Sequence, residues 1–447
     1  MKDKPLAKTY RTLEVSQIVD TIQAGDSCTI VGVGSAGKSN LLRFLRREDI
    51  LRERLGPQYL LVYVDGNKLI ECSEWGLWEL MLHQTTLAVE ERGDATVEIV
   101  QALDQLYNQA IGAETRDFAV RYLDRTLNLV RKRLGLRLVF LLDEFDELYE
   151  QLPASGFSAL RALRDDHKYQ LSYLVATRQE WRRLRQEPEA AEAFEELVSP
   201  QTIWLGPYAD SDARDMLERL AARHGKPLDG ATQRLLLKET GGHPGLLSAA
   251  YRTAIENSRA LDRSLRSSAR IQDECRRIWY SLPADQQQAV GAMAVDLETN
   301  PPTGPVAAQL ENKGLIAEVG PARYALFSRL FGDCIVQLGL HTGPQVRVDR
   351  NLHAVIVGNR RVDDLPALPF ALIEYLDRHR GRACSRAELI GHLYPDEPQD
   401  DSASIDGRLD TVVARLRRAI EPDPSEPRYI LTVRGHGYRL TDGQGER

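Results

Sequence analysis

The 447-residue sequence has few cysteines and no long apolar run. Its five cysteines are an odd number and include no C-x-x-C pair, which argues against a disulfide framework. The longest apolar runs, such as Leu138–Leu142, are far shorter than the roughly 20 residues that a membrane-spanning helix requires. Met1–Pro5 lacks the apolar stretch of a secretory signal, and the nine histidines show no metal-ligand spacing. We therefore expect a cytoplasmic protein that does not bind a membrane.

The charge balance is slightly acidic. The chain has 58 lysines and arginines against 65 aspartates and glutamates, which gives a net charge of −7. This balance excludes a general nucleic-acid coat protein, so any DNA binding has to come from a restricted basic patch and to be sensitive to salt. The length of 447 residues predicts two to four domains, because single cores of this size are rare.

A glycine-rich segment near the N-terminus carries the clearest chemical signal. Gly32–Ser39 has the sequence GVGSAGKS and fits the phosphate-loop pattern G-x-x-x-x-G-K-[ST] at every fixed position. The apolar run Cys28–Val31 precedes it and an amphipathic helix follows, a placement that a chance glycine-rich turn does not explain. Such a loop turns N–H groups toward a polyphosphate, while Lys38 reaches the β and γ phosphates and Ser39 binds Mg²⁺. The residues expected to bind nucleotide are Gly32, Gly34, Ser35, Ala36, Gly37, Lys38, Ser39 and Asn40.

Two further segments carry charged residues that complement the loop. Leu138–Leu142 predicts a strand buried on both faces, and Asp143 and Glu144 follow it, where open α/β sheets bind ligands. We expect Asp143 to hold Mg²⁺ through water and Glu144 to polarise the attacking water. Arg178 follows the next apolar run, a position where similar ATPases place a residue that contacts the γ-phosphate. The alternatives are acids that only cap a strand and an arginine that is only a surface charge.

The order of the apolar runs predicts a parallel sheet. Helical patterns separate these runs, which favours an α/β P-loop NTPase core with helices on both faces of the sheet. The long helical stretch Glu74–Arg133 has charged outer faces and predicts an insertion packed on the sheet, and Ser211 is expected to cap the first helix of a lid. The expected strands are Cys28–Val31, Tyr59–Val64, Leu138–Leu142, Leu171–Ala176 and Thr202–Leu205.

A turn with the sequence GGHPG follows at Gly241–Gly245. On its own it indicates no more than a connection between two helices. Together with the phosphate loop, the run LLDEFD at 141–146 and the pair Thr177-Arg178, it resembles the STAND ATPases, a branch near the AAA+ proteins. The resemblance implies that His243 and Pro244 contact nucleotide from a helical lid, with ATP and Mg²⁺ as cofactors. No clear Gly-Arg box precedes the first strand, so the adenine contacts stay unassigned.

The resemblance continues beyond the lid. Leu310–Ile316, followed by Tyr324–Ser328, predicts a helix, a glycine break and a two-stranded wing. This pattern is similar to the small winged-helix domain that follows the lid in these ATPases. In that group the domain serves packing and switching, so we expect no DNA contact from it.

The C-terminal part begins after a linker at Gly343-Pro344. Short strands are expected at Val346–Val348 and Val355–Val357, followed by helices at Phe370–His379 and from the N-cap Ser385 to Leu393. A third helix then has two distinct faces at helical spacing. Its core-facing residues are Leu409, Val412, Val413, Leu416 and Ile420, and its opposite face carries Arg408, Thr411, Arg415 and Arg418.

The polar face of this third helix suits phosphates and guanine edges in a major groove, although a solvated charged face is the alternative. The sequence from Leu416 to Leu440 closely resembles the OmpR/PhoB-type winged-helix output domain of response regulators, with Arg434 and Tyr438 flanking a tight glycine hairpin. The resemblance implies that the third helix enters the major groove and that the wing, with Arg434, enters the adjacent minor groove. The family often has a polar residue in place of Val412, and no receiver domain precedes this module.

These observations together predict four segments. They are a P-loop ATPase core (1–207), a helical lid (208–270), a winged-helix domain (271–342) and an OmpR/PhoB-type winged-helix DNA-binding domain (343–447). The favoured function is an ATP-binding, slowly hydrolysing switch that binds double-stranded DNA as a nucleotide-controlled transcription regulator. The sequence leaves open whether ATP is turned over or only held.

Two alternative functions remain. One is a DNA-stimulated AAA+-like ATPase for replication initiation or transposition, for which Arg182 or Arg183 would supply an arginine finger to a neighbouring subunit. The other is a STAND-type defence sensor, against which the lack of a helical-repeat array counts. RNA polymerase and a sensor protein are further candidate partners, and self-association on ATP or DNA is expected.

Overall fold

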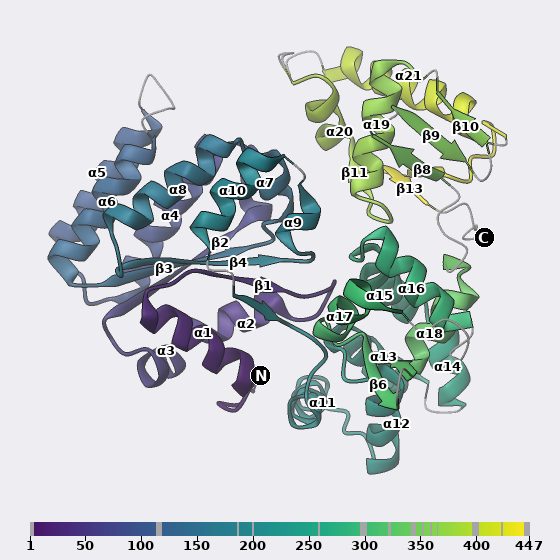
Figure 1. The fold of residues 1–447 in the computed structure, drawn as a ribbon, viewed down its shortest axis with the longest axis horizontal. Coiled ribbons are helices and arrows are strands. Elements are labelled where there is room, and N and C mark those ends of the chain that lie inside the picture. Colours follow the sequence, from purple (N-terminus) through teal and green to yellow (C-terminus); the bar gives the residue numbers. More distant parts are fainter. Residues whose placement is uncertain are drawn as a thin grey trace. The chain divides into compact units, whose positions relative to one another are not determined.

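The computed structural model describes residues 4–112, 119–185, 187–198, 201–257, 260–295, 302–320, 323–340, 346–350, 353–357, 360–363, 365–395, 402–421 and 423–441. The chain forms two compact units (Figure 1). The first comprises Met1–Glu274, Ser281–Pro283 and Pro302–Leu330, and the second comprises Cys275–Tyr280, Ala284–Pro301 and Phe331–Arg447. The expected linker Gly343-Pro344 lies outside the described residues. Within the described residues, no helix is both long enough and apolar enough to cross a membrane.

The first unit is built on a parallel sheet, as the sequence predicts. Its five strands pair in the order β2-β3-β4-β1-β5, and every pair is parallel. The strand that carries the phosphate loop, β1, therefore lies inside the sheet, one strand away from β3. The strands are β1 (Cys28–Val31), β2 (Tyr59–Asp65), β3 (Arg137–Asp143), β4 (Leu171–Thr177) and β5 (Thr202–Trp204).

Both faces of this sheet are covered. Leu138, Phe140 and Leu142 of β3 belong to a core shared with the helices from α4 to α10, whereas the alternate residues Val139 and Leu141 are buried outside that core. Because side chains alternate across a strand, the second set faces the opposite layer. Figure 1 shows α1, α2 and α3 on that side. The expected α/β P-loop NTPase fold is confirmed.

The helices of this core follow the sequence pattern closely. The expected helical insertion at 74–133 is present as three helices, α4, α5 and α6, which pack against one another, with α4 also on β2. The core helices are α1 (Thr12–Ala24), α2 (Lys38–Leu45), α3 (Glu48–Arg54), α4 (Glu74–Arg92), α5 (Val97–Ile111), α6 (Ala119–Leu134), α7 (Asp146–Gln151), α8 (Ala154–Asp166), α9 (Trp181–Leu184) and α10 (Pro188–Leu197), with a 3-10 turn η1 (Gly66–Lys68).

A set of helices follows the sheet and forms the expected lid. Ser211 does not cap the first of them: α11 begins at Asp210 with Ala209 as its N-cap, and no side chain caps it. The carboxylate of Asp212 instead accepts a hydrogen bond from the backbone N–H of Arg11, a distant contact that the local pattern does not contain. These helices are α11 (Asp210–His224), α12 (Gly230–Thr240), α13 (Pro244–Glu256) and α14 (Leu261–Ser267).

The small wing predicted after the lid is also present. Helix α17 (Gly304–Asn312) ends shortly before Gly314, whose positive φ of 64° turns the chain into an antiparallel hairpin. The hairpin consists of β6 (Ile316–Gly320) and β7 (Arg323–Leu326). Two helices contribute residues to both units, α15 (Ala269–Tyr280) and α18 (Arg329–Gln337), and α16 (Ala284–Val295) belongs to the second unit.

The C-terminal part of the second unit is a winged helix. One three-stranded antiparallel sheet has the order β10-β9-β8, and a second has the order β11-β13-β12. Ser385 caps α20 in a complete capping box with Glu388, as its sequence predicts. The elements are β8 (Val346–Asp349), β9 (Ala354–Val357), β10 (Arg360–Val362), α19 (Ala367–Arg378), β11 (Cys384–Ser385), α20 (Arg386–Leu393), α21 (Ser402–Ile420), β12 (Ile430–Val433) and β13 (Gly437–Leu440).

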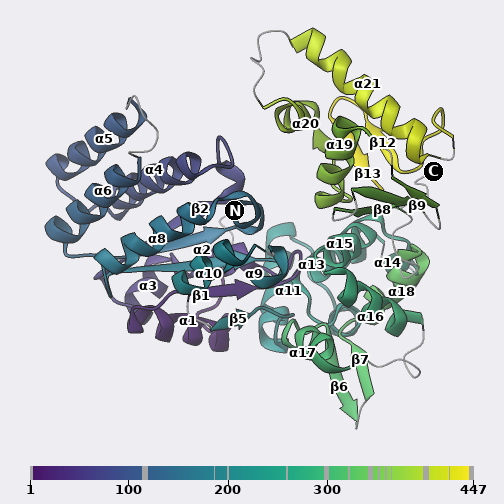
Figure 2. The ribbon, with the colours of Figure 1, turned by 45° about the horizontal axis from the view of Figure 1, so that its top comes forward.

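Helix α21 is fixed at its C-terminal end by a buried carboxylate. It packs against α19 and α20 (Figure 2), and all five of its expected core residues are buried. Glu421, directly after the helix, accepts hydrogen bonds from the backbone N–H groups of Arg428, Tyr429 and Ile430 at 2.7–2.9 Å. These charge-assisted bonds hold the end of the helix against the start of β12.

Candidate functional site

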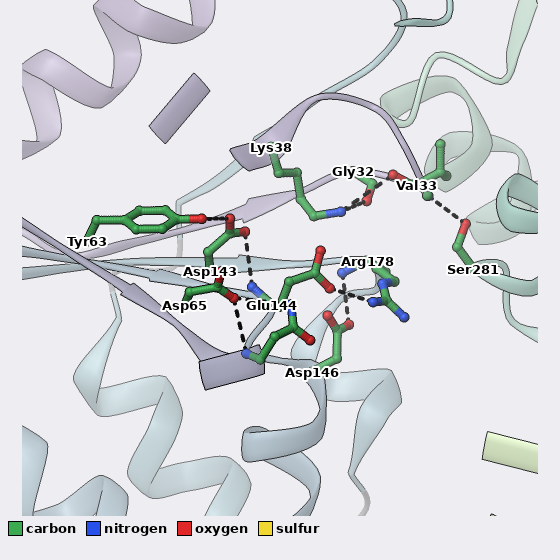
Figure 3. A network of polar contacts seen from close by, with 12 residues as sticks. Gly32, Val33, Lys38, Tyr63, Asp65, Asp143, Glu144, Asp146, Arg178 and Ser281 are labelled. Carbon is green, nitrogen blue, oxygen red and sulfur yellow. Dashed lines mark hydrogen bonds and ion pairs between the residues drawn. The ribbon is translucent and has the colours of Figure 1, made fainter. Parts of the chain in front are cut away.

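The strand order brings three distant segments to one edge of the parallel sheet. The phosphate loop follows β1, Asp143 and Glu144 lie at the end of β3, and Arg178 follows β4, the strand between them. Because parallel strands end at the same edge, these side chains converge (Figure 3). The site residues that the sequence predicts in this core therefore come together.

The phosphate loop has the backbone that its glycines allow. Gly37 has a φ of 96° directly before α2, and Ser35 also has a positive φ, of 57°. Lys38 begins α2, and its ammonium donates a hydrogen bond to the carbonyl oxygen of Gly32 at 2.7 Å and lies 3.5 Å from that of Val33 (Figure 3). Ser39 and the exposed Asn40 lie in the first turn of this helix. The positive end of α2 is thus directed at the loop.

Lys38 is a buried cation whose bonded partners in this structure are neutral carbonyl oxygens. It is 6% exposed, and burial lowers the pKa of its ammonium, while Asp146 and Glu144 act in the opposite direction. A desolvated ammonium gains from an anion at this position more than an exposed one does. The loop, the helix end and this lysine together fit a polyphosphate.

The carboxylate of Asp143 is buried and held in a fixed orientation. The hydroxyl of Tyr63, on the adjacent strand β2, donates to one of its oxygens at 2.6 Å, and the backbone N–H of Glu144 donates to the other at 3.0 Å. Asp143 is 1% exposed. With Ser39 across the edge of the sheet, this oxygen donor suits Mg²⁺, which prefers oxygen ligands. Sequence reasoning did not identify Tyr63, because only the pairing of β2 with β3 places it there.

Glu144 and Arg178, both assigned to catalysis, form an ion pair. Their side chains are 2.5 Å apart, and the backbone N–H of Arg178 donates to Asp146 at 2.8 Å (Figure 3). Burial opposes ionisation of Glu144, but Arg178 and Lys38 outweigh it and hold the pKa of this carboxyl below its usual range. Burial raises the pKa of Asp146, whose second carboxylate oxygen is buried without a hydrogen-bond partner among the described residues.

The lid turn packs directly on the phosphate loop. A side chain at Gly245 would approach the Cβ of Ser35 to 2.6 Å, so glycine is needed there, and Pro244 lies near Gly37. His243 is fully buried and caps α13. Its Nε2 has no hydrogen-bond partner among the described residues, and burial lowers its pKa to about 3. The expected nucleotide contacts His243 and Pro244 are thus beside the loop, where the first is a neutral imidazole.

Arg11 is a residue of this site that sequence reasoning missed. Its buried guanidinium donates to the carbonyl oxygen of Ala36 in the phosphate loop at 2.9 Å and to that of Gly206 after β5 at 2.7 Å. It also lies 4.6 Å from the ring centre of Tyr208, and its backbone bonds to the lid at Asp212. Arg11 therefore joins loop, sheet and lid. The absence of a Gly-Arg pair hid it, although an arginine that adopts φ 44° before α1 is itself unusual.

The two arginines considered as arginine fingers have partners within this chain. Arg182 pairs with Glu195, and Arg183 bonds to the side-chain oxygen of Gln309. Both contacts lie within the first unit. A role toward a neighbouring subunit would require these contacts to open.

The expected DNA-binding residues form an exposed surface within the second unit. Arg408, Thr411, Arg415 and Arg418 are all exposed on α21, opposite its buried face. Arg434 is exposed at the turn between β12 and β13, next to Gly435 with a φ of 72°. The angular separation of the two faces that the sequence predicts is therefore present, while contact with DNA stays a prediction.

An aspartate on the same helix fixes its relation to the wing. The Asp410 carboxylate accepts a hydrogen bond from Arg386 at 2.8 Å and one from the Tyr438 hydroxyl at 2.6 Å. The hydrogen bond from Arg386 is the main reason that the pKa of Asp410 is lowered. This arrangement ties α21 to α20 and β13. The sequence gave no signal for it, because the three residues are 24 to 52 positions apart.

Solved structures with some likeness to the chain are ATPases and replication proteins. A Walker-type ATPase of Pyrococcus abyssi, paby2304, aligns with 75% of this chain and 99% of its own at 15% identity and a TM-score of 0.47. The ORC1 protein of Aeropyrum pernix, in complex with DNA, aligns with 89% of this chain and 94% of its own at 14% identity and a TM-score of 0.40. Because these TM-scores are below 0.5, the fold of the first unit rests on its own strand order and phosphate loop.

The C-terminal part of the chain has clear sequence relatives. Residues 362–440 match the family model described as transcriptional regulatory protein, C terminal. The sensory transduction protein RegX3 of Mycobacterium tuberculosis is 41% identical over 101 residues, which are 23% of this chain and 42% of that protein. Protein PetR of Rhodobacter capsulatus is 41% identical over 102 residues, with the same coverage, so the chain spans less than half of these relatives. Residues 362–440 thus form a winged-helix domain of the transcriptional regulatory protein C-terminal family, attached to a P-loop NTPase fold.

Proposed function

We propose that the chain is an ATP-binding switch whose nucleotide state governs DNA binding by its C-terminal winged helix, and that it acts as a transcription regulator. One observation carries this proposal. Lys38, Asp143, Glu144 and Arg178 converge at one edge of a parallel sheet, in a chain that also bears a transcriptional regulatory domain. A nucleotide held between sheet and lid can shift a conformational equilibrium through the different contacts of its two forms.

The residues at the sheet edge have distinct roles in this proposal. The loop N–H groups and Lys38 bind the phosphates, and Ser39 and Asp143 bind Mg²⁺, which supplies charge neutralisation at the phosphates when it is present. Glu144 accepts a proton from the attacking water only after its ion pair with Arg178 opens. A carboxylate that is engaged in this way favours slow turnover, which suits a switch.

The second unit supplies the DNA contact. The guanidinium groups of Arg408, Arg415 and Arg418 on α21 suit phosphates and guanine edges in the major groove, and Arg434 suits the adjacent minor groove. The relatives named as sensory transduction proteins support a regulatory role. Those proteins are more than twice as long as the matched part, so the activity of this chain as a whole rests on the proposal.

The test is a binding assay on DNA selected from genomic fragments by the purified full chain. The affinity is measured with ATP, with ADP and without nucleotide. For the wild type we expect the affinities with ATP and ADP to differ by about 5-fold or more, the range of ordinary allosteric coupling. Lys38→Ala should remove this difference, whereas Lys132→Ala, at an exposed lysine of α6, should keep it. Equal affinities in all three conditions would contradict the coupling.

A further inference from the structure

One N–H group of the phosphate loop is already engaged by a side chain from far along the sequence. The backbone N–H of Gly34 donates a hydrogen bond to the hydroxyl oxygen of Ser281 at 3.0 Å (Figure 3). The two residues are 247 positions apart. Ser281 is 4% exposed and its neighbour Leu282 is 3% exposed, so this segment is buried in the first unit.

Gly34 lies at the end of the loop where the terminal phosphate of a triphosphate belongs. The ammonium of Lys38, the group that reaches the β and γ phosphates, is bonded to Gly32 and lies near Val33, the two residues directly before Gly34. The residues that start α2, Lys38 and Ser39, are at the other end of the loop. A diphosphate can therefore use the loop while Ser281 stays in place, whereas a γ-phosphate needs the N–H that Ser281 occupies.

The chain around Ser281 connects this contact to the second unit. Ser281–Pro283 is a three-residue part of the first unit, and in the sequence it is preceded by Cys275–Tyr280 and followed by Ala284–Pro301, which belong to the second unit. A second residue just before this stretch, Glu274, also lies at the site: a side chain at Gly245 would meet both Glu274 and Ser35. Any displacement of Ser281 is transmitted along the chain to α15 and α16.

We propose that the Ser281 hydroxyl is a displaceable occupant of the γ-phosphate position, which makes the site discriminate between ATP and ADP and which releases the segment between α15 and α16 when ATP binds. This inference rests on the proposed nucleotide binding and deepens it. The phosphate oxygens and the serine oxygen accept from the same Gly34 N–H, so they exclude each other. ADP leaves the contact intact.

The test compares nucleotide affinities of the full chain by calorimetry, with Mg²⁺, ADP and a non-hydrolysable ATP analogue. Ser281→Ala removes the competing acceptor, so the affinity for the ATP analogue should rise about two- to tenfold while the affinity for ADP stays within twofold. The matched control is Ser328→Ala, at a buried serine of the first unit whose hydroxyl donates to the carbonyl oxygen of Glu239. This control should leave the ratio of the two affinities unchanged.

A measurement on the wild type keeps the proposal testable if Ser281→Ala does not fold. Hydrogen exchange of the peptides covering 275–295 should be faster with the ATP analogue than with ADP. Equal exchange, or an affinity for the ATP analogue that is unchanged or lower in Ser281→Ala, would overturn the role of Ser281. If the wild type binds neither nucleotide, the proposed function itself fails, which is a different result from nucleotide binding with an unaltered ratio.

Discussion

The buried imidazole of His243 predicts a specific dependence of stability on pH. This side chain is fully buried, caps α13 by accepting from the N–H of Leu246 at 3.4 Å, and has a pKa lowered to about 3, with burial as the main cause and Arg11 as a second one. In the unfolded chain its pKa is about 6.5. Between these values the unfolded state binds the extra proton, so the contribution of His243 is complete above pH 6.5 and is lost as the pH falls toward 3.

The size of this effect follows from the two pKa values. At pH 5 the unfolded chain gains about 1.36 kcal/mol for each of the 1.5 pH units below its own pKa, roughly 2 kcal/mol relative to pH 7. The substitution His243→Asn removes the titrating group but keeps a side-chain oxygen that can cap α13. We therefore expect the wild type to lose about 2 kcal/mol more free energy of unfolding than His243→Asn between pH 7 and pH 5.

The assay is equilibrium urea unfolding of the full chain, followed by tryptophan fluorescence. Four of the five tryptophans, Trp75, Trp78, Trp181 and Trp204, are in the first unit, so the signal reports mainly on that unit. The control is His224→Asn, at an exposed histidine of the same lid, which should keep the wild-type pH dependence. If the wild type and His243→Asn lose the same free energy between pH 7 and pH 5, the imidazole is not buried in its neutral form and the packing of the lid turn on the phosphate loop is wrong.

Three further predictions concern the nucleotide site and the DNA surface. Glu144→Gln should bind ATP but hydrolyse it about 10²- to 10⁴-fold more slowly, and unchanged turnover would show that another group activates water. Tyr63→Phe should raise the Mg²⁺ concentration for half-maximal ATP binding by about two- to tenfold, since Asp143 loses its hydrogen bond, and should leave binding without Mg²⁺ unaltered. Arg415→Ala should weaken DNA binding by about 1 to 3 kcal/mol, whereas Arg361→Ala, at an arginine of β10 that pairs with Asp363, should not, and an equal effect of both would argue against α21 as the contact helix.

The sequence by itself determined the local chemistry of this protein. The spacing of glycines and lysine in Gly32–Ser39 predicts the loop, and the apolar run before Asp143 and Glu144 predicts the strand that presents them. The two faces of α21 follow from helical periodicity alone, and burial confirms them. These features could be predicted because each depends on residues within about ten positions of one another, where hydrophobic periodicity and backbone preference act directly.

Only the tertiary structure decided how these local features are connected. The ion pair of Glu144 with Arg178, the bridge that Arg11 makes to the loop and the contact of Ser281 with Gly34 join residues 25 to 247 positions apart. Ser211, a good capping residue in its local sequence, does not cap α11. Such pairings depend on which strand lies between two others and on where the lid packs, and these follow from the burial of the whole core and not from any short pattern.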